Sequence, residues 1–223
     1  MGCCGNCDDK IPNYNERVDG SVYPVTPFNY GWLEYKLHPD TMEYLWDCIG
    51  NKKESNKNNL VGQLNASYYL EDTNGYFNNT VIMPLIDKYH QSFGTYVPNS
   101  SGFYGNASYV MKDWWVNYQK EGDFNPIHNH GGIYSFVIWM KIPTSHEEQN
   151  STYRSKDSNT QVISDFHMTY INSLGDIDKH QYKMNPYMEG YMLFFPSKMH
   201  HIVYPFFDCD EERISISGNV YLI

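Results

Sequence analysis

Positive charge is scarce in this chain of 223 residues, which carries 26 acidic and only 16 basic side chains, for a formal net charge of −10. Non-specific binding to nucleic acid or anionic lipid depends on clustered Lys and Arg, so this balance argues against bulk nucleic acid as a partner. Arginine is the rarest charged residue, with only Arg17, Arg154 and Arg213. Each of the three therefore needs its own explanation.

Long apolar segments are also lacking. No run approaches the roughly 20 residues that span a bilayer, and the first residues have no apolar segment of the kind that marks a signal peptide. We therefore expect a soluble, intracellular protein with no membrane partner. Asn, Lys and Tyr are abundant relative to Arg, as AT-rich codons would produce. This bias suggests a microbial, viral or phage genome, and hence the cytoplasm of a microbe or of an infected host cell.

Cysteine is too sparse and too irregular for a disulfide framework. The chain has five cysteines, an odd number, and three of them are bunched as Cys3, Cys4 and Cys7. Secreted domains held by disulfides show an even, spread set in a much shorter chain. The terminal cluster is either a soft-metal site or a reduced, frayed terminus, and the sequence leaves its role open.

Aromatic residues, in contrast, are plentiful, with 21 Tyr, 11 Phe and 5 Trp, and 41% of the chain is hydrophobic. That content suffices for one good core. We expect a single domain over 1–223. It would comprise an irregular arm at 1–30, a helical support at 31–100 and a β-rich core at 101–223.

Two helices are predicted in the support. The first covers 39–50, where Asp40 or Thr41 can cap the N-terminus. Apolar side chains recur there at helical spacing, namely Met42, Leu45, Trp46 and Ile49. The second covers about 76–93, and Pro84 must bend or restart it.

The pattern changes after Pro98 to short β-rich runs separated by polar loops. A polar stretch at 144–160 reads as an insertion loop, of the kind that is usually solvated but sometimes borders an active site. Helices followed by strands favour a mainly β protein with N-terminal helices packed on one side of a β-sandwich or barrel. The expected strands cover 108–110, 114–118, 134–142, 166–171, 190–195 and 213–223.

Histidine gives the clearest chemical signal. His128 and His130 are spaced i, i+2, so in an extended segment both rings leave the same face of the sheet. Two neighbouring imidazoles form a ready pair of ligands for a divalent transition metal, although exposed strand histidines would show the same spacing. His200 and His201 begin a strand after the turn at Pro196. Adjacent strand residues point to opposite faces, so at most one of this pair can join the first.

The segment that begins at Arg213 alternates strictly. Arg213, Ser215, Ser217 and Asn219 share one face, and Ile214 and Ile216 share the other. An arginine among small polar residues makes a poor core. It suits a carboxylate, because a guanidinium grips a carboxylate in a bidentate fork while a hydroxyl adds a third hydrogen bond. An amphipathic edge strand facing water is the alternative.

These segments share an order with a known family: His-x-His, about 70 residues, Gly-x4-Phe-Pro-Ser-x3-His-x-Val, about ten residues, then Arg-x-Ser-x-Ser-x-Asn. The order resembles the non-haem Fe(II), 2-oxoglutarate-dependent oxygenases of the double-stranded β-helix (jelly-roll, cupin-like) fold. In particular it resembles small enzymes of marine bacteria and phages that are distantly similar to prolyl hydroxylases. The resemblance is good from about residue 105 to the end and weak before it.

The resemblance implies a set of roles. His128 and His201 would bind Fe(II), and Arg213 with Ser215 would hold the distal carboxylate of the cosubstrate 2-oxoglutarate. Asn117 and Asn219 match positions that line the pocket. The enzyme would couple decarboxylation of 2-oxoglutarate by O2 to oxidation of a substrate, with ascorbate as a supporting reductant. That substrate is a peptidyl proline, a free amino acid or a small metabolite, and the oligomeric state is open.

Position 130 departs from the usual pattern of two histidines and one carboxylate, because His130 stands in the place of the carboxylate. A site of three histidines would carry one more positive charge than the usual one, which should raise the potential of the iron. Alternatively, His130-Gly131-Gly132 matches the His-x-Gly of halogenases, or Asp123 supplies the carboxylate.

Two rival functions remain open. One is a cupin-type dioxygenase with three histidine ligands that uses no 2-oxoglutarate, which would leave Arg213 and Ser215 unexplained. The other is a non-catalytic, metal-binding β-barrel. Four aromatic residues would either shield the site from water or simply fill the core, namely Trp114, Trp115, Tyr134 and Trp139.

Overall fold

The computed structural model describes residues 20–22, 27–56, 62–96 and 108–223. The cysteine cluster at Cys3, Cys4 and Cys7, Arg17 and most of the expected arm lie outside these residues. None of the described helices is long and apolar enough to cross a membrane.

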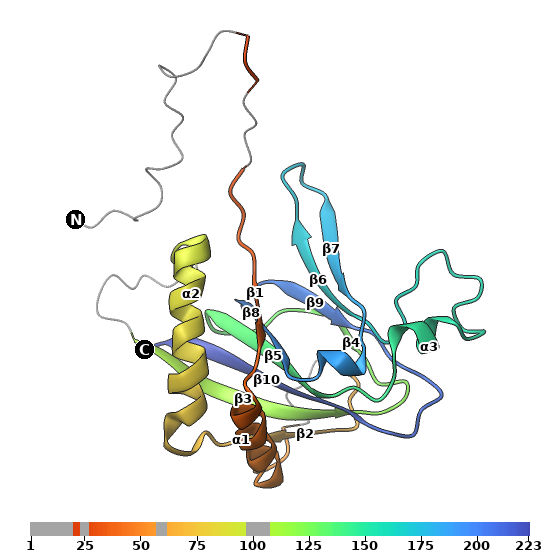
Figure 1. The fold of residues 1–223 in the computed structure, drawn as a ribbon, viewed down its shortest axis with the longest axis horizontal. Coiled ribbons are helices and arrows are strands. Elements are labelled where there is room, and N and C mark those ends of the chain that lie inside the picture. The colour runs from red at the N-terminus through yellow and green to blue at the C-terminus, as the bar shows by residue number, and fades with distance from the viewer. Residues whose placement is uncertain (1–19, 23–26, 57–61, 97–107) are drawn as a thin grey trace.

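Two antiparallel sheets make up the β part of the described chain (Figure 1). The major sheet has the strand order β1-β8-β5-β10-β3-β2, and the minor sheet has the order β4-β9-β6-β7. The prediction of a mainly β protein with helices at its N-terminal side is confirmed. The strands are β1 (Leu33–Lys36), β2 (Ala66–Tyr69), β3 (Tyr109–Gln119), β4 (Asn125–His128), β5 (Tyr134–Lys141), β6 (Phe166–Ile171), β7 (Ile177–Tyr182), β8 (Tyr191–Pro196), β9 (His200–Val203) and β10 (Arg213–Leu222).

Three differences from the expected strands have simple causes. The two runs at 108–110 and 114–118 are one strand, β3, because Met111 and Asp113 between them continue the pairing with β10 across a shift in register. The region 31–100 contributes β1 and β2 to the major sheet as well as helices. These strands have four residues each, too short to show a period. β7 was missed because it is polar and mostly exposed.

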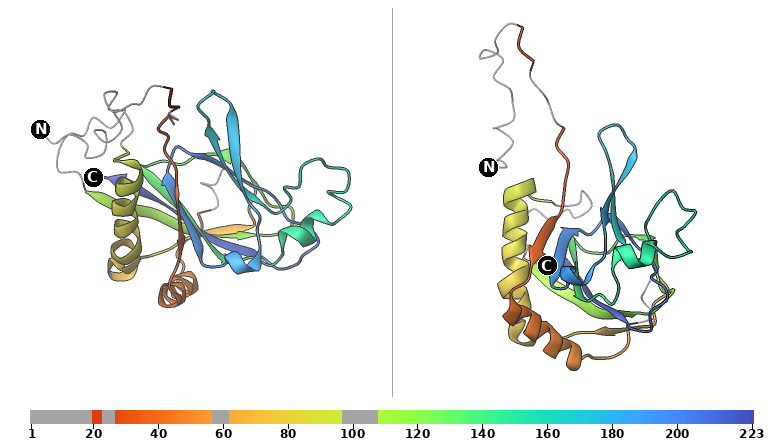
Figure 2. Two further views of the ribbon diagram at one scale, coloured as in Figure 1. Left: turned by 45° about the horizontal axis from the view of Figure 1, so that its top comes forward. Right: turned by 45° about the vertical axis from the view of Figure 1, so that its right-hand side comes forward.

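Two helices cover the outer face of the major sheet (Figure 2). Helix α1 (Pro39–Gly50) has the predicted bounds, but its N-cap is His38 rather than Asp40 or Thr41. Pro39 takes the first helical position, where its missing N–H costs nothing, so the residue before it must cap the helix. The His38 Nδ1 atom accepts from the Asp40 N–H at 3.4 Å.

The buried face of α1 also differs in part from the prediction. Leu45 and Ile49 are buried, as expected, but Trp46 is 40% exposed. Cys48 takes a place on the buried face that the predicted pattern gave to the tryptophan. The buried stripe of the helix is therefore rotated about the helix axis relative to the predicted one.

The second predicted helix is divided as the proline required. A π-helical segment (Asn78–Ile82) precedes helix α2 (Met83–Phe93), and Pro84 lies in the first turn of α2. The first-turn position is the one that tolerates a residue without an N–H donor. Pro84 is thus accommodated by restarting the helix.

The polar stretch at 144–160 is only partly a loop. It begins with the short helix α3 (His146–Asn150), which Ser145 and Glu148 close with a reciprocal capping box. His146, Gln149 and Asn150 are buried. The start of this insertion is therefore packed against the core and not solvated.

The central strands of the major sheet divide their side chains between two cores. Ile214, Ile216 and Val220 of β10 belong to the cluster beneath the helices. Arg213 and the polar residues between them line a pocket on the opposite face. The predicted alternation of this strand is confirmed. A second apolar cluster joins β5 and β8 to the minor sheet and includes Val137, Trp139, Phe166, Met168, Leu193 and Phe195.

This division corrects the expectation for the four aromatic residues. Trp114 and Tyr134 pack under the helices, so they cannot shield a site between the sheets. Trp115 and Trp139 line the pocket. Strand alternation explains this division, because residues an odd number of positions apart on one strand point to opposite faces.

Candidate metal centre

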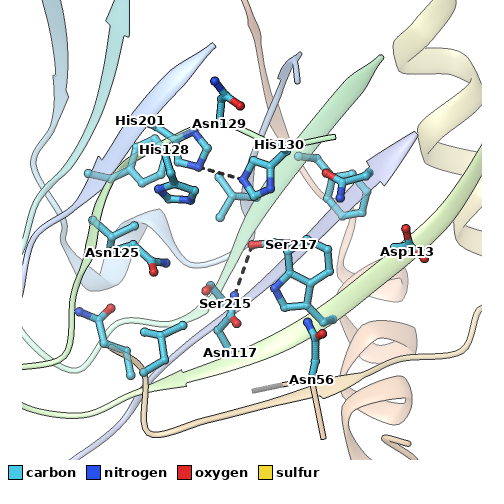
Figure 3. A pocket seen from close by; sticks show the side chains of 18 of the residues that line it. Asn56, Asp113, Asn117, Asn125, His128, Asn129, His130, His201, Ser215 and Ser217 are labelled. Carbon is cyan, nitrogen blue, oxygen red and sulfur yellow. Dashed lines mark hydrogen bonds between the residues drawn. The ribbon is translucent and has the colours of Figure 1, made fainter. Parts of the chain in front are cut away.

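Strand pairing brings the two separated histidine segments together. In the register of β4 and β9, His128 lies directly opposite His201. His130 follows β4 by two residues, and its ring stacks on that of His201 with centroids 4.9 Å apart. Figure 3 shows the three rings together at one end of a pocket. The expected pair from 128–130 and one histidine of 200–201 therefore meet.

The nitrogen atoms of these rings have the spacing of ligands to one ion. Nε2 of His130 and Nε2 of His201 are 3.1 Å apart. Two ligands at about 2.1 Å from a metal and at right angles to each other would be about 3 Å apart. One nitrogen from each of the three histidines lies within 4.8 Å of the others. We call this group, His128, His130 and His201, the histidine cluster.

Backbone carbonyls fix the tautomers of two of the rings. Nδ1 of His128 lies 2.7 Å from the Pro126 carbonyl, and Nδ1 of His201 lies 3.4 Å from the Met199 carbonyl. A carbonyl only accepts, so Nδ1 carries the proton in each case and Nε2 keeps its lone pair. Both unprotonated nitrogens are thus available to a metal.

A tight turn positions His130. Gly132 has a φ of 81°, and a Cβ there would lie 2.5 Å from the Val220 carbonyl oxygen, so only glycine fits. The His130 N–H donates to the Ser197 carbonyl at 2.8 Å, and the Ser197 hydroxyl donates to the Gly132 carbonyl. His130 is therefore held by the turn that follows β8.

Burial keeps the cluster neutral. It lowers the pKa of His130 to about 4, with His128 and Lys198 adding to the effect. Burial also lowers the pKa of His201 well below its usual range, with added repulsion from the other two histidines. Phe166 and Phe195 pack against the His201 ring. Neutral imidazole is the form that binds metal, so the site is prepared for a cation at neutral pH.

The other candidate ligands lie elsewhere. His200 is exposed, and its Nε2 contacts the Asn129 side-chain amide at 3.0 Å. Asp123 accepts the backbone N–H groups of Asn65 at 2.6 Å and of Lys120 at 3.0 Å. Its carboxylate thus closes a turn and is not part of the histidine cluster. The described residues place no carboxylate in that cluster.

A pocket of about 410 Å³ extends from the histidine cluster across the inner face of the major sheet. Arg213 lines it and is only 2% exposed. Burial lowers the pKa of this guanidinium to about 10, an effect that the nearby Asp165 opposes. No carboxylate of the described residues forms an ion pair with Arg213, and its buried Nε has no hydrogen-bond partner. A buried, unpaired cation is costly unless an anion joins it.

Small polar side chains line the same pocket as Arg213 and the histidine cluster. Ser215, Ser217 and Asn219 of β10 and Asn117 of β3 all line the pocket. Asn117 donates to the Ser217 hydroxyl at 3.4 Å, and its buried Oδ1 has no partner. Asn219 accepts from the Ser135 hydroxyl at 2.8 Å.

This arrangement fits a metal and a dianion together. Three neutral imidazoles at ligand spacing suit a divalent transition metal. At the same time, the unpaired Nε donor of Arg213 leaves hydrogen-bonding capacity unused in the same pocket. A small molecule with one carboxylate for the arginine and a second end at the metal would use both the arginine and the histidine cluster. The residues present therefore fit Fe(II) and 2-oxoglutarate.

Sequence reasoning missed the groups that support the site. Ser164, which binds Arg213, lies in a polar insertion with no period to reveal it. The turn at Gly132 was also missed, although a glycine pair directly after a histidine motif is a signal that could have indicated it. Arg154 lies away from this site and forms a half-exposed ion pair with Asp208 at 3.4 Å.

Comparison with known proteins supports the class of Fe(II), 2-oxoglutarate-dependent oxygenases. Residues 113–219 match the model of a family described as "Putative 2OG-Fe(II) oxygenase", where 2OG is 2-oxoglutarate. A search of curated proteins found no match.

One solved structure shares the fold, and a second is similar at a lower score. An oxidoreductase of the 2OG-Fe(II) oxygenase family from Burkholderia pseudomallei superposes with a TM-score of 0.50 and 12% identity, covering 82% of this chain and 78% of that one. A prolyl-4-hydroxylase from Pseudomonas putida gives a TM-score of 0.48 and 14% identity, covering 85% of this chain and 91% of that one.

The core is thus a double-stranded β-helix, as predicted. Residues 113–219 match a 2OG-Fe(II) oxygenase domain, and this match indicates an enzyme of that class. Members of the class depend on Fe(II) and 2-oxoglutarate and act on small-molecule or peptide substrates.

Proposed function

We propose that His128, His130 and His201 hold the catalytic Fe(II) through their Nε2 atoms. The ring spacing, the tautomers of His128 and His201, and the burial that keeps all three neutral support this assignment. Backbone carbonyls and the turn at Gly132 keep the rings in place before metal binds. Preorganised ligands of this kind lower the cost of ordering the site on binding.

Arg213 and Ser215 hold the distal carboxylate of 2-oxoglutarate, and Asn117 and Asn219 line the channel between that carboxylate and the metal. The observation that carries this proposal is the buried arginine without a carboxylate partner, in one pocket with the histidine cluster. A dianion would supply the missing charge. A chain with a net charge of −10 would otherwise repel such a ligand, so the attraction must be local.

The bound iron and 2-oxoglutarate supply the oxidising chemistry, in which O2 converts 2-oxoglutarate to succinate and CO2 and oxidises a substrate C–H bond to an alcohol. The chain orients the cosubstrate through Arg213 and excludes water with the aromatic walls of Trp139, Phe166 and Phe195. Ascorbate supports turnover by keeping iron reduced. The substrate is a small molecule or a peptide.

The third histidine sets this site apart from the usual triad. With no carboxylate ligand, the protein leaves both positive charges of Fe(II) to be balanced by the cosubstrate. Loss of a negative ligand should raise the potential of the metal. We therefore expect slower turnover than a site with a carboxylate would give, and a stronger dependence of metal affinity on bound 2-oxoglutarate.

The test is succinate formation from 2-oxoglutarate with Fe(II), O2 and ascorbate, measured alone and with panels of prolyl peptides, free amino acids and small metabolites. We expect slow uncoupled turnover that Arg213→Ala and His201→Ala both abolish. His200→Ala is the matched control, because it removes the adjacent exposed histidine and should retain activity.

Two outcomes would redirect the proposal. Unchanged cosubstrate affinity in Arg213→Ala would refute the carboxylate assignment and favour a cupin-type dioxygenase with three histidines. Metal-dependent thermal stabilisation without succinate under any condition would favour the non-catalytic β-barrel.

A further inference from the structure

The insertion between β5 and β6 supplies the protein partner of Arg213. Nη2 of the guanidinium donates to the Ser164 carbonyl at 2.7 Å and also to the Ser164 hydroxyl. Phe206 packs on the guanidinium from another side, with its ring centroid 5.2 Å from Cζ. Among the described residues, Ser164 is the only one that hydrogen-bonds this side chain.

Ser164 adopts a conformation that serine rarely takes. Its φ is 75°, in the left-handed region, and the residue is fully buried. Its N–H donates to the Pro205 carbonyl at 2.8 Å, which fixes the backbone. A left-handed non-glycine residue costs about 1–3 kcal/mol and persists where the surroundings enforce it, often at functional sites. Here the conformation presents both oxygens of one residue to one nitrogen.

The next residue places a fully buried carboxylate behind the arginine. Asp165 accepts from the Gln181 amide at 2.6 Å and the Met184 N–H at 3.2 Å, and it pairs with Nδ1 of His146 at 2.9 Å. It does not bind Arg213, but its charge favours the cationic guanidinium. Asp165 therefore helps to keep the arginine charged without occupying any of its donors.

We infer that Ser164 is a positioning residue for 2-oxoglutarate, which orients the Arg213 guanidinium toward the distal carboxylate by occupying Nη2. This inference rests on the proposed function. With Nη2 committed to Ser164, the donors that remain for a ligand are those of Nη1 and Nε. Ser164 thus acts on cosubstrate binding through Arg213, without contacting the cosubstrate.

The test is calorimetric titration of Mn(II)-loaded protein with 2-oxoglutarate and, separately, with 2-oxobutanoate, which keeps the oxo acid but lacks the distal carboxylate. Ser164→Ala should weaken 2-oxoglutarate binding by about 10-fold, the effect of one charge-assisted hydrogen bond, and leave 2-oxobutanoate binding unchanged. Ser164→Gly removes the same hydroxyl while relieving the backbone, and it should weaken binding equally. Ser151→Ala, which changes an exposed serine of the same insertion, is the control.

In the succinate assay, Ser164→Ala should raise the KM for 2-oxoglutarate and leave kcat at saturation unchanged.

The outcomes separate the inference from the function on which it rests. If wild-type protein binds both oxo acids equally, the role of Arg213 fails and the inference fails with it. If wild type prefers 2-oxoglutarate and Ser164→Ala shows the same preference, only the inference is overturned. Wild-type affinity in Ser164→Gly with weak binding in Ser164→Ala would overturn the role of the hydroxyl, because backbone strain alone would then explain the loss.

Discussion

The two faces of the major sheet use the same strands for opposite purposes. On the helix side, Ile216 and Val220 of β10 are fully buried in an apolar cluster. On the pocket side, Arg213 and Ser215 of the same strand line the cavity beside the histidine cluster. Neighbouring residues of β10 therefore face the apolar core and the pocket in turn. Substitutions on the core face should affect stability, and substitutions on the pocket face should affect ligand binding.

The largest difference should follow from replacing the pocket arginine with an apolar residue of similar length. Arg213→Met should weaken 2-oxoglutarate binding by roughly 100-fold or more, because a buried charged contact is lost. The same change should shift the thermal midpoint little, since removing a buried charge that has no ion-pair partner offsets the hydrogen bonds lost to Ser164. Calorimetry and thermal unfolding of the same preparations measure both effects. A lower midpoint with unchanged affinity would make Arg213 a structural residue and erase the contrast between the faces.

Neighbouring residues on β10 offer a matched pair with a smaller effect. At Gly218, on the helix side, an added Cβ would lie 2.5 Å from the Phe136 ring and 2.7 Å from Trp114 Cβ. Gly218→Ala should therefore destabilise the fold by about 1–3 kcal/mol, as overpacking does. Ser217→Ala, on the pocket side, should change stability by less than about 0.5 kcal/mol. Urea unfolding compares them, and equal losses would show that the pocket face also carries structural packing.

The smallest effect concerns His167, on the face of β6 opposite the cluster. It is buried, and neither ring nitrogen has a hydrogen-bond partner in the part of the chain that the structure describes. Burial, aided by Lys179, lowers its pKa. Because the pKa is lower in the folded state, the unfolded chain binds the extra proton as pH falls below about 6.5. The free energy of unfolding linked to His167 is therefore fully present above that pH and declines below it.

The variant His167→Phe should remove the contribution of His167 to the fall in the free energy of unfolding. That contribution is at most about 1.4 kcal/mol per pH unit. Urea unfolding of metal-free wild type and variant between pH 8 and pH 5 measures the difference, to which the histidine cluster contributes equally in both. If the free energy of unfolding depends on pH identically in the two proteins, water or a rearrangement must supply hydrogen bonds to the His167 ring.

Strong periodicity made part of this molecule predictable. The alternation from Arg213 to Asn219 predicted which side chains share a face, and the pairing of β10 with β3 and β5 bears this out. The bounds of α1 followed from its proline and its apolar spacing, whereas its cap did not, since histidine is an unusual N-cap.

The rest depends on contacts that no local pattern records. β1 and β2 have four residues each and owe their conformation to neighbours in the sheet. Ser164 reaches Arg213 across 49 residues of sequence, from a stretch whose composition indicates only a loop. The spacing of His128 and His130 suggested a shared face, but only the register of β4 with β9 sets His201 against them.

The most direct test of the site is a crystal soaked without oxygen in Fe(II) and 2-oxoglutarate. The account predicts one iron bound by Nε2 of His128, His130 and His201, with the distal carboxylate of 2-oxoglutarate on Nη1 and Nε of Arg213 and Nη2 still on Ser164. An iron that His130 does not contact, or a distal carboxylate bound away from Arg213, would contradict it.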